Sequence, residues 1–268
     1  MELPFYEASR NGNVPLVEEI LRDNSTLDVN WKNGLDNGMT ALLAACECGR
    51  DAVVAILLAH PGTNVNVKDS AGQTPFEWAC YSGSTQSVRL LLKDPRILVN
   101  EPAYDGRTPV RQAACNGNVD VIKWWIASGR DLNLGRPGHF PSDAIMEARN
   151  HRNVLRPHQE PQRMRKTKVA TLLERFKENP VGTRFDVRMG LGLRAEIAAE
   201  LFALVVFVSD GILRRPQMET PATRFFGIAT QLPLELQMVL CFRTVGSAKY
   251  IIPGLVSEEA FRDLASSI

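Results

Sequence analysis

The first half of the chain repeats one pattern every 34 residues. Thr40, Thr74 and Thr108 are separated by this interval, and each has one glycine two residues before it and another nine residues after it. Threonine followed by proline is typical of a helix start, because the hydroxyl caps the first turn and proline lacks only an N–H that would have no intrahelical partner. The later glycine supplies the left-handed backbone that ends such a helix. We expect similar helix pairs to stack, because one pair cannot bury its apolar face alone.

The unit resembles the ankyrin repeat, whose period is about 33 residues and whose signature is a turn, a Thr-Pro-Leu-His helix start and a second helix. Four copies begin with Leu3-Pro4-Phe5-Tyr6, Thr40-Ala41-Leu42-Leu43, Thr74-Pro75-Phe76-Glu77 and Thr108-Pro109-Val110-Arg111. They close with Val29-Asn30, Val65-Asn66, Val99-Asn100 and Leu132-Asn133. The resemblance implies an all-α solenoid of helix pairs with β-hairpin-like loops. Every copy lacks the family's histidine, so the usual side-chain ties between adjacent turns are not implied.

We expect residues 1–178 to form this repeat domain, with four regular units and an interrupted fifth, and residues 179–268 to form a helical C-terminal domain. The fifth unit starts near Phe140-Pro141-Ser142-Asp143, and its second helix is expected at 168–176. Between them lies a basic insertion, 149–168, with seven lysines and arginines and Glu160 as its only acid. Two prolines and few apolar residues predict a loop, either solvated or available to a phosphate-bearing partner or RNA. The insertion lacks base-stacking aromatic residues, so nucleic acid is not the expected partner.

The charge balance, the apolar runs and the cysteines argue against a nucleic-acid-binding, membrane or metal-binding protein. Lys+Arg total 31 against 30 Asp+Glu, so the net charge is +1 and no overall field favours nucleic acid or an anionic membrane. The longest apolar run, 198–208, contains Glu200 and is shorter than the ~20 residues that span a bilayer. Cys46 and Cys80 occupy one small-residue position of the repeat, which predicts reduced core thiols and no metal site. With no secretory signal at the N-terminus, we expect an intracellular protein, cytoplasmic or nuclear, without a cofactor.

Two adjacent tryptophans, Trp124 and Trp125, would suit an aromatic platform for a base or a cation. They align, however, with the apolar positions 56–58 and 90–92 of the preceding units. The alignment favours a core role, with the indole N–H bonded at the edge of the core.

The expected binding surface lies on the hairpin tips and the first helices, which a solenoid leaves free of core packing. Tyr81, Tyr104 and Arg107 are the best anchors, because tyrosine and arginine dominate interface hot spots. By alignment of the units, the whole set is Arg10, Asn11, Asn37, Met39, Glu47, Cys48, Ser70, Gln73, Tyr81, Ser82, Tyr104, Asp105, Arg107 and Asn116. We therefore expect a monomeric protein-binding module, and the sequence does not identify its partner.

A cofactor fingerprint is also present at 184–210. Gly190 and Gly192 stand between two apolar segments, with Asp210 after the second, as in the strand, glycine turn, helix and strand of dinucleotide-binding folds. The stretch 194–208 equally fits one amphipathic helix, with one face formed by Ile197, Leu201, Leu204, Val205 and Val208. The residues that follow offer no further crossover to complete a sheet, so the helix is favoured over a nucleotide-binding enzyme.

The end of the chain is similar to an F-box. Leu232-Pro233-Leu234-Glu235-Leu236 opens an apolar helix, and Phe261-Arg262-Asp263-Leu264-Ala265 follows it. Over residues 230–266, the resemblance implies a substrate-recruiting adaptor of a cullin-type ubiquitin ligase. The ligase's linker protein would then contact Pro233, Leu234 and Met238. The alternative is a helical cap on the solenoid, in which the same residues would be covered.

The sequence shows no catalytic constellation. The four histidines lie in turns or in the basic insertion, and no serine or cysteine nucleophile stands in a recognisable motif. We therefore expect a protein that is not an enzyme.

Overall fold

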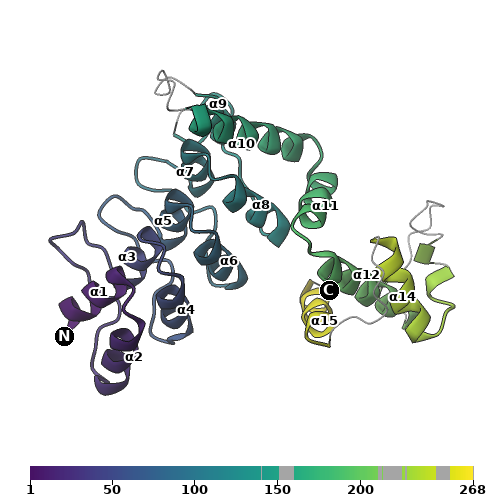
Figure 1. Ribbon diagram of the computed structural model, residues 1–268, viewed down its shortest axis with the longest axis horizontal. Helices are drawn as coiled ribbons and strands as arrows, with labels where there is room; N and C mark the ends of the chain where they lie inside the picture. Colours follow the sequence, from purple (N-terminus) through teal and green to yellow (C-terminus); the bar gives the residue numbers. More distant parts are fainter. Residues whose placement is uncertain are drawn as a thin grey trace. The chain divides into compact units, whose positions relative to one another are not determined.

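The computed structural model describes residues 1–139, 141–150, 160–210, 213, 225–226, 228–245 and 254–267. The chain divides into two compact units, Met1–Arg184 and Phe185–Ile268, which we call the N-terminal and the C-terminal unit (Figure 1). The boundary between them falls inside the helix α11 (Pro180–Gly190).

The N-terminal unit is a stack of helix pairs, each with a first and a second helix. The first helices are α1 (Glu2–Asn11), α3 (Ala41–Glu47), α5 (Pro75–Ser82), α7 (Pro109–Asn116) and α9 (Ala144–Arg149). The second helices are α2 (Val14–Asp23), α4 (Asp51–Ala59), α6 (Thr85–Lys93), α8 (Val119–Ser128) and α10 (Glu160–Glu178). First helices contact first helices and second helices contact second helices, which gives the two rows seen in Figure 1. The predicted all-α repeat architecture is confirmed.

Side-chain caps explain why threonine recurs at the helix starts. The Oγ1 of Thr40 accepts a hydrogen bond from the N–H of Leu43 at 3.4 Å, and Thr74 caps the N–H of Glu77 at 3.2 Å. The fifth unit uses Asp143, whose Oδ1 accepts from a backbone N–H three residues on at 2.9 Å. Thr108 departs from the prediction, because its side chain makes no such hydrogen bond. Helix α7 therefore starts at Pro109 without a side-chain cap.

Hairpin tips precede three of the first helices. The segments 33–39, 69–73 and 103–107 are each closed by a backbone hydrogen bond between their end residues, and the first is the longest. Neighbouring tips are also tied together. The N–H of Ser70 donates to the carbonyl of Asn37 at 2.8 Å, and the N–H of Tyr104 donates to the carbonyl of Ala71 at 3.0 Å. The three tips therefore form one continuous edge.

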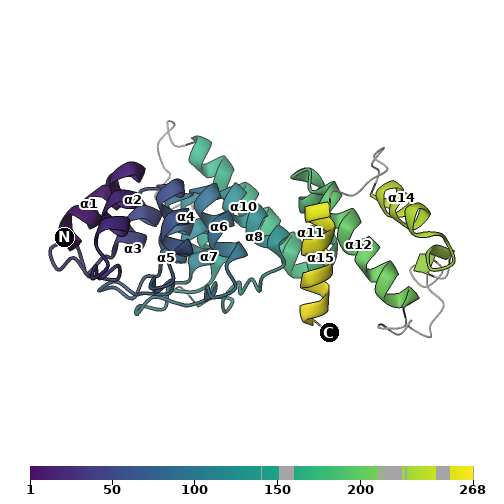
Figure 2. The ribbon, with the colours of Figure 1, turned by 90° about the horizontal axis from the view of Figure 1, so that it is seen from below.

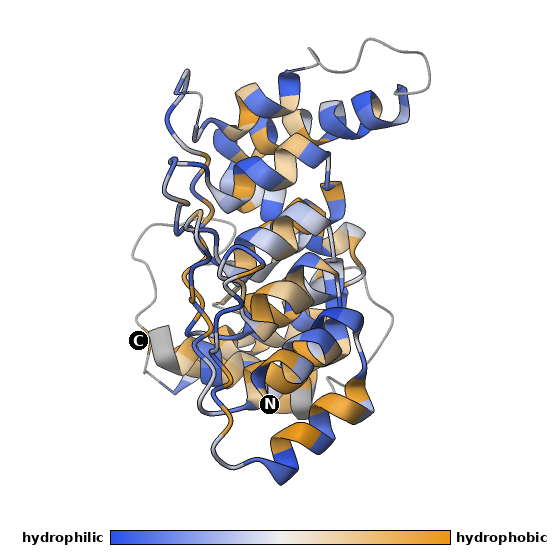
Figure 3. Cartoon of the chain, turned by 90° about the vertical axis from the view of Figure 1, so that its left-hand side faces the viewer, coloured by the Kyte–Doolittle hydropathy of each residue, from blue (hydrophilic) through white to orange (hydrophobic). Residues whose placement is uncertain are grey.

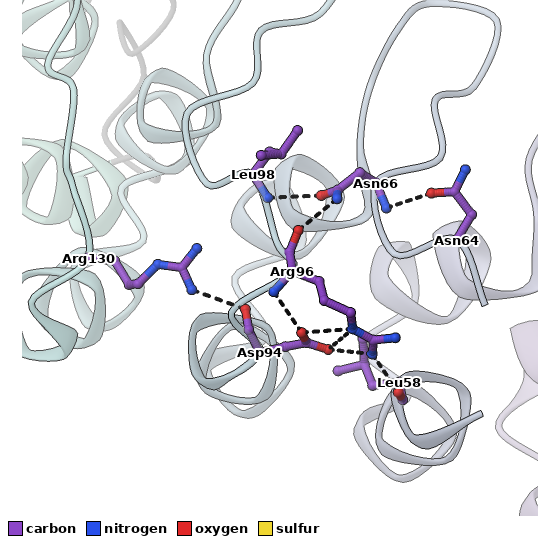
Figure 4. A network of polar contacts seen from close by, with 7 residues as sticks. All are labelled: Leu58, Asn64, Asn66, Asp94, Arg96, Leu98 and Arg130. Atoms are coloured by element: carbon purple, nitrogen blue, oxygen red, sulfur yellow. Dashed lines mark hydrogen bonds and ion pairs between the residues drawn. The ribbon is translucent and has the colours of Figure 1, made fainter. Parts of the chain in front are cut away.

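The recurring asparagines link consecutive units. The Oδ1 of Asn66 accepts from the N–H of Leu98 at 2.9 Å, and its Nδ2 donates to the carbonyl of Arg96 at 2.8 Å (Figure 4). Asn30 and Asn100 make the same two kinds of bond to the units that follow them. An asparagine amide holds an acceptor and donors in one plane, so it can pair with a backbone N–H and a carbonyl together. The Val-Asn pair thus recurs because its valine is buried and its asparagine holds the next unit.

The core runs through the faces at which the helices meet, and most helices carry both hydrophobic and hydrophilic residues (Figure 3). Trp125 is fully buried, with its ring 4.8 Å from that of Phe76 and its indole N–H donating to the carbonyl of Asp131 at 3.0 Å. The core prediction is confirmed for Trp125 and is wrong for Trp124. The latter is partly exposed, and the guanidinium of Arg89 lies 4.0 Å from its ring centroid. Adjacent positions of a helix face about 100° apart, so only one of the two rings can enter the core.

Helix α10 contradicts the predicted loop over part of the basic insertion. Residues 160–168 are helical, and 151–159 lie outside the described residues. Lys166 is buried, where its Nζ lies 4.0 Å from the Oε1 of Glu147 and donates to the carbonyl of Asn150 at 3.4 Å. Glu147 of α9 thus supplies a buried carboxylate that pairs with Lys166 of α10. With this contact, α10 extends into a stretch that has few apolar residues.

The C-terminal unit packs α12 (Arg194–Ser209) against α14 (Leu234–Thr244) and α15 (Gly254–Ser267). Phe202 and Phe242 are buried in its core, and the ring of Phe261 lies edge-to-face on Phe202 at 5.9 Å. The buried residues of α12 are Ala198, Ala199, Phe202, Ala203 and Val205, and the predicted face contained only Val205 of these.

The dinucleotide fingerprint is not formed. The segment before Gly190 belongs to α11, Gly192 turns the chain with a φ of 79°, and 194–208 lie within one helix, as the favoured alternative predicts. Asp210 is the C-cap residue of that helix. A dinucleotide site needs a strand on each side of the glycine turn and its helix, and here both flanking segments are helices.

Candidate protein-binding surface

Tyr104 stands out on the hairpin tips, with 72% of its surface exposed. Its ring lies over Gly72, where an added Cβ would come within 2.6 Å of a ring carbon. The ammonium of Lys68 lies 5.5 Å from the ring centroid. The glycine, with a φ of +82°, therefore leaves room for a tyrosine that is exposed and yet supported by its neighbours.

Tyr81 is the second exposed aromatic residue, at the end of α5. It is 46% exposed and packs edge-to-face on Trp78 at 5.6 Å. The indole N–H of Trp78 in turn donates to the Oδ2 of Asp69 at 3.0 Å, which ties the helix to its hairpin tip. Asn116 of α7 donates to the carbonyl of Tyr81 at 2.7 Å. Sequence alignment of the units missed Trp78, because its position in the other copies carries no aromatic residue.

Charged residues at the N-terminal end of the unit neutralise one another. Arg10 of α1 binds Asp36 in the first tip and lies 4.0 Å from Glu47 of α3. The hydroxyl of Tyr6 also donates to Asp36. Burial raises the pKa of Tyr6, and the hydrogen bond to the carboxylate raises it further. Arg10 and Glu47 are therefore partly engaged in holding α1 to the first tip and to α3.

The remaining predicted residues divide between surface and core. Exposed positions are Asn11, Asn37, Ser70, Ser82 and Asp105, and half-buried positions are Glu47, Cys48, Arg107 and Asn116. Met39 and Gln73 do not belong to the surface, with exposures of 2% and 7%. Met39 packs with the core side chain of Leu43, and Gln73 faces Glu77. Alignment of the units could not separate these residues, because hairpin positions alternate between solvent and core. It also missed Leu35, which is 98% exposed in the first tip.

A buried carboxyl group lies near the third tip. The Oε1 of Glu77 accepts hydrogen bonds from the amides of Gln112 at 3.3 Å and Gln73 at 3.5 Å, whereas its Oε2 has no hydrogen-bond partner among the described residues. Burial raises the pKa of Glu77 to about 7, against the lowering effects of the two amides and of Arg107. Arg107 itself binds Asp105 at 2.5 Å within the tip.

Three of the five cysteines, Cys46, Cys80 and Cys241, are buried thiols. All five cysteines are free, and no group of three or more His, Cys, Asp or Glu in the described part of the chain is placed to hold a metal ion. Burial raises the pKa of Cys46, of Cys80 and, to about 12, of Cys241. Such thiols are poor nucleophiles, because the thiolate is the reactive form.

The residues expected in an adaptor helix divide between exposed and half-buried positions. At the start of α14, Pro233 is exposed and Leu234 and Leu236 are 54% and 51% exposed. Met238 is half-buried against the core of the C-terminal unit. The two exposed leucines stand two positions apart in the first turn of α14, so they present two separate apolar side chains.

A shallow groove of about 440 Å³ runs between the second helices α4 and α6. Its lining includes Leu58, Leu90 and Arg96. Arg96 donates to the carbonyl of Leu58 at 2.7 Å and pairs with Asp94 at 2.6 Å (Figure 4). The hydrogen bonds from Arg96 lower the pKa of Asp94. The arginine at this groove thus connects α4 to the end of α6.

Comparison with known proteins agrees with the repeat pattern. Residues 5–101 and 70–136 match a family model described as ankyrin repeats in three copies. No curated protein matches the sequence. Among the described residues, no helix combines the length and the apolar character needed to cross a membrane. Ankyrin repeats are therefore present in the helix pairs within residues 5–136 of the N-terminal unit.

Proposed function

We propose that the ankyrin repeats bind a partner protein through the hairpin tips and the C-terminal ends of the first helices, which we call the tip surface. The observation that carries this proposal is the pair of tyrosines, Tyr81 and Tyr104, which are exposed and yet held by Trp78 and Gly72. A supported aromatic side chain offers a large contact area and loses little conformational freedom on binding. Arg107 adds a guanidinium that can recognise a carboxylate.

A photo-crosslinking residue at position 104 would capture the partner for identification, and affinity can then be measured by calorimetry. The variant Y81A/Y104A/R107A should bind the purified partner at least about tenfold more weakly, because a single hot-spot truncation costs about 2 kcal/mol or more. The variant R89A/L98A/W124A removes a similar set of side chains outside the tip surface and should keep its affinity. Unchanged binding by the first variant would overturn the proposal.

Recruitment of a ubiquitin ligase is the second candidate, and the exposed Leu234 and Leu236 on α14 favour it. In this function the tip surface selects a protein and α14 contacts the linker protein of a cullin-type ligase. L234D/L236D should remain folded, since exposed substitutions usually cost within ~0.5 kcal/mol, but should lose binding of the purified linker protein. Failure of the unmodified chain to bind the linker protein would exclude this function and leave the first candidate untouched.

The free thiols support an intracellular location, cytoplasmic or nuclear, because disulfides are rare in those compartments. We propose that the chain acts there as a monomeric binding module.

A further inference from the structure

We propose that the first two turns of α10 form a second docking site, which takes an acidic protein segment carrying an apolar side chain. The inference rests on the proposed function, because it adds a contact for the same protein partner. We call the exposed residues Arg163, Met164, Arg165 and Lys168 the basic strip.

Apart from Lys166, the side chains of these turns are not buried in the core. The other second helices have 9 or 10 residues, whereas α10 has 19. Among residues 160–168, Lys166 alone is buried. Figure 2 shows the start of α10 reaching beyond the shorter helices of the row. The extra turns are therefore available for an external contact.

Two of the three cations of the basic strip have no acidic partner among the described residues. Arg165 and Lys168 form no ion pair among the described residues, and Arg163 has Glu160 at 3.9 Å. Arg165 and Lys168 stand three positions apart, and like charges at this spacing destabilise a helix. A partner that brings carboxylates would remove this repulsion.

The arrangement around Met164 indicates the chemistry of that partner. Met164 is 55% exposed, Lys168 lies one turn further along the same face, and Arg163 and Arg165 flank it. An apolar side chain bordered by aspartates or glutamates fits this pattern. Single-stranded RNA fits it less well, because the basic strip has no aromatic ring on which a base could stack.

The basic strip adjoins the tip surface. An added Cβ at Gly117, the C-cap residue of α7, would come 3.0 Å from the Cβ of Arg165. The preceding residue, Asn116, donates to the carbonyl of Tyr81 at 2.7 Å. A protein anchored on Tyr81 can therefore extend its chain to Arg165.

Fluorescence anisotropy with the full chain tests the inference. The probes are a short labelled peptide that places leucines among glutamates, the same peptide with lysines in place of the glutamates, and labelled polyuridylate. The acidic peptide should bind, the lysine peptide should not, and affinity should fall as salt rises from about 50 to 200 mM. R163E/R165E/K168E should weaken binding about tenfold or more. R22E/K93E/K123E makes the same change of charge on α2, α6 and α8 and should keep the affinity.

With these probes, three results would overturn the inference: no binding of the acidic peptide, equal binding by the basic-strip variant, or tighter binding of polyuridylate than of the peptide. The tip-surface variant Y81A/Y104A/R107A separates this inference from the proposed function. If the tip-surface variant weakens binding of the identified partner and the basic-strip variant does not, the inference fails and the proposed function stands. If neither variant weakens that partner, the proposed function fails as well.

Discussion

Arg111 and Glu147 form a buried ion pair between the fourth and fifth helix pairs, with 2.8 Å between Nη2 and Oε2. Both residues are buried, and the Nζ of Lys166 lies 4.0 Å from the other carboxylate oxygen. Arg111 occupies the position at which ankyrin repeats usually carry histidine. This copy therefore holds its neighbour through a different side chain, and two cations share one acid.

Loss of the shared acid should be more damaging than loss of one cation. E147Q removes the buried carboxylate that Arg111 and Lys166 share and should destabilise the N-terminal unit by about 3–5 kcal/mol. R111M should cost less, because Glu147 retains Lys166. Urea denaturation followed by circular dichroism measures both. R107M breaks the exposed pair with Asp105 and serves as a control, with a cost below about 1 kcal/mol. An equal cost for E147Q and R107M would contradict the burial argument.

The asparagine link between units should be measurable at Asn66. N66A removes two hydrogen bonds to the following unit and should cost about 2 kcal/mol, since each contributes about 1 kcal/mol. N66D keeps the hydrogen-bond acceptor and removes the donor, so it should lower the free energy of unfolding by less than N66A does. Thermal unfolding gives the comparison. N11A, at an exposed asparagine, should leave the melting temperature unchanged. If N11A lowered the melting temperature as much as N66A, the stabilising link assigned to Asn66 would be contradicted.

Glu77 should make stability depend on pH. Its pKa is about 7 in the fold and has an ordinary value of 4.5, so between these values the folded chain holds a proton that the unfolded chain has released. Stability should therefore fall as pH rises through this interval, by on the order of 3 kcal/mol. E77Q removes the titrating group. Chemical denaturation at several pH values in this interval should show that the free energy of unfolding of E77Q rises relative to that of the parent chain as pH rises. A constant difference between the two would contradict this account.

The two adjacent tryptophans should respond differently to truncation. W125A empties a fully buried site and should cost about 3–5 kcal/mol. W124A removes a partly exposed ring that stacks on Arg89 and should cost about 1 kcal/mol or less. Chemical denaturation of the two single variants provides the test. Similar losses would mean that both rings contribute to the core.

Local signals account for what the sequence predicted correctly. Thr40 and Thr74 start helices through bonds that reach three residues along the chain. The repeated small-residue position likewise placed Cys46 and Cys80 in the core, and both are fully buried. Such rules act within one turn or repeat from one unit to the next, so the spacing of residues is enough to find them.

What the sequence alone determined is therefore the repeat and its helix boundaries in the regular units. The tertiary structure decided which side chains meet across those units: Trp78 beneath Tyr81, Glu147 between Arg111 and Lys166, and Met39 in the core although it belongs to a hairpin tip. It also decided that 160–168 are helical, because the acid that holds Lys166 lies on another helix. Sequence spacing reports neighbours along one helix, whereas burial and ion pairing depend on distances between helices, which exist only once the units are stacked.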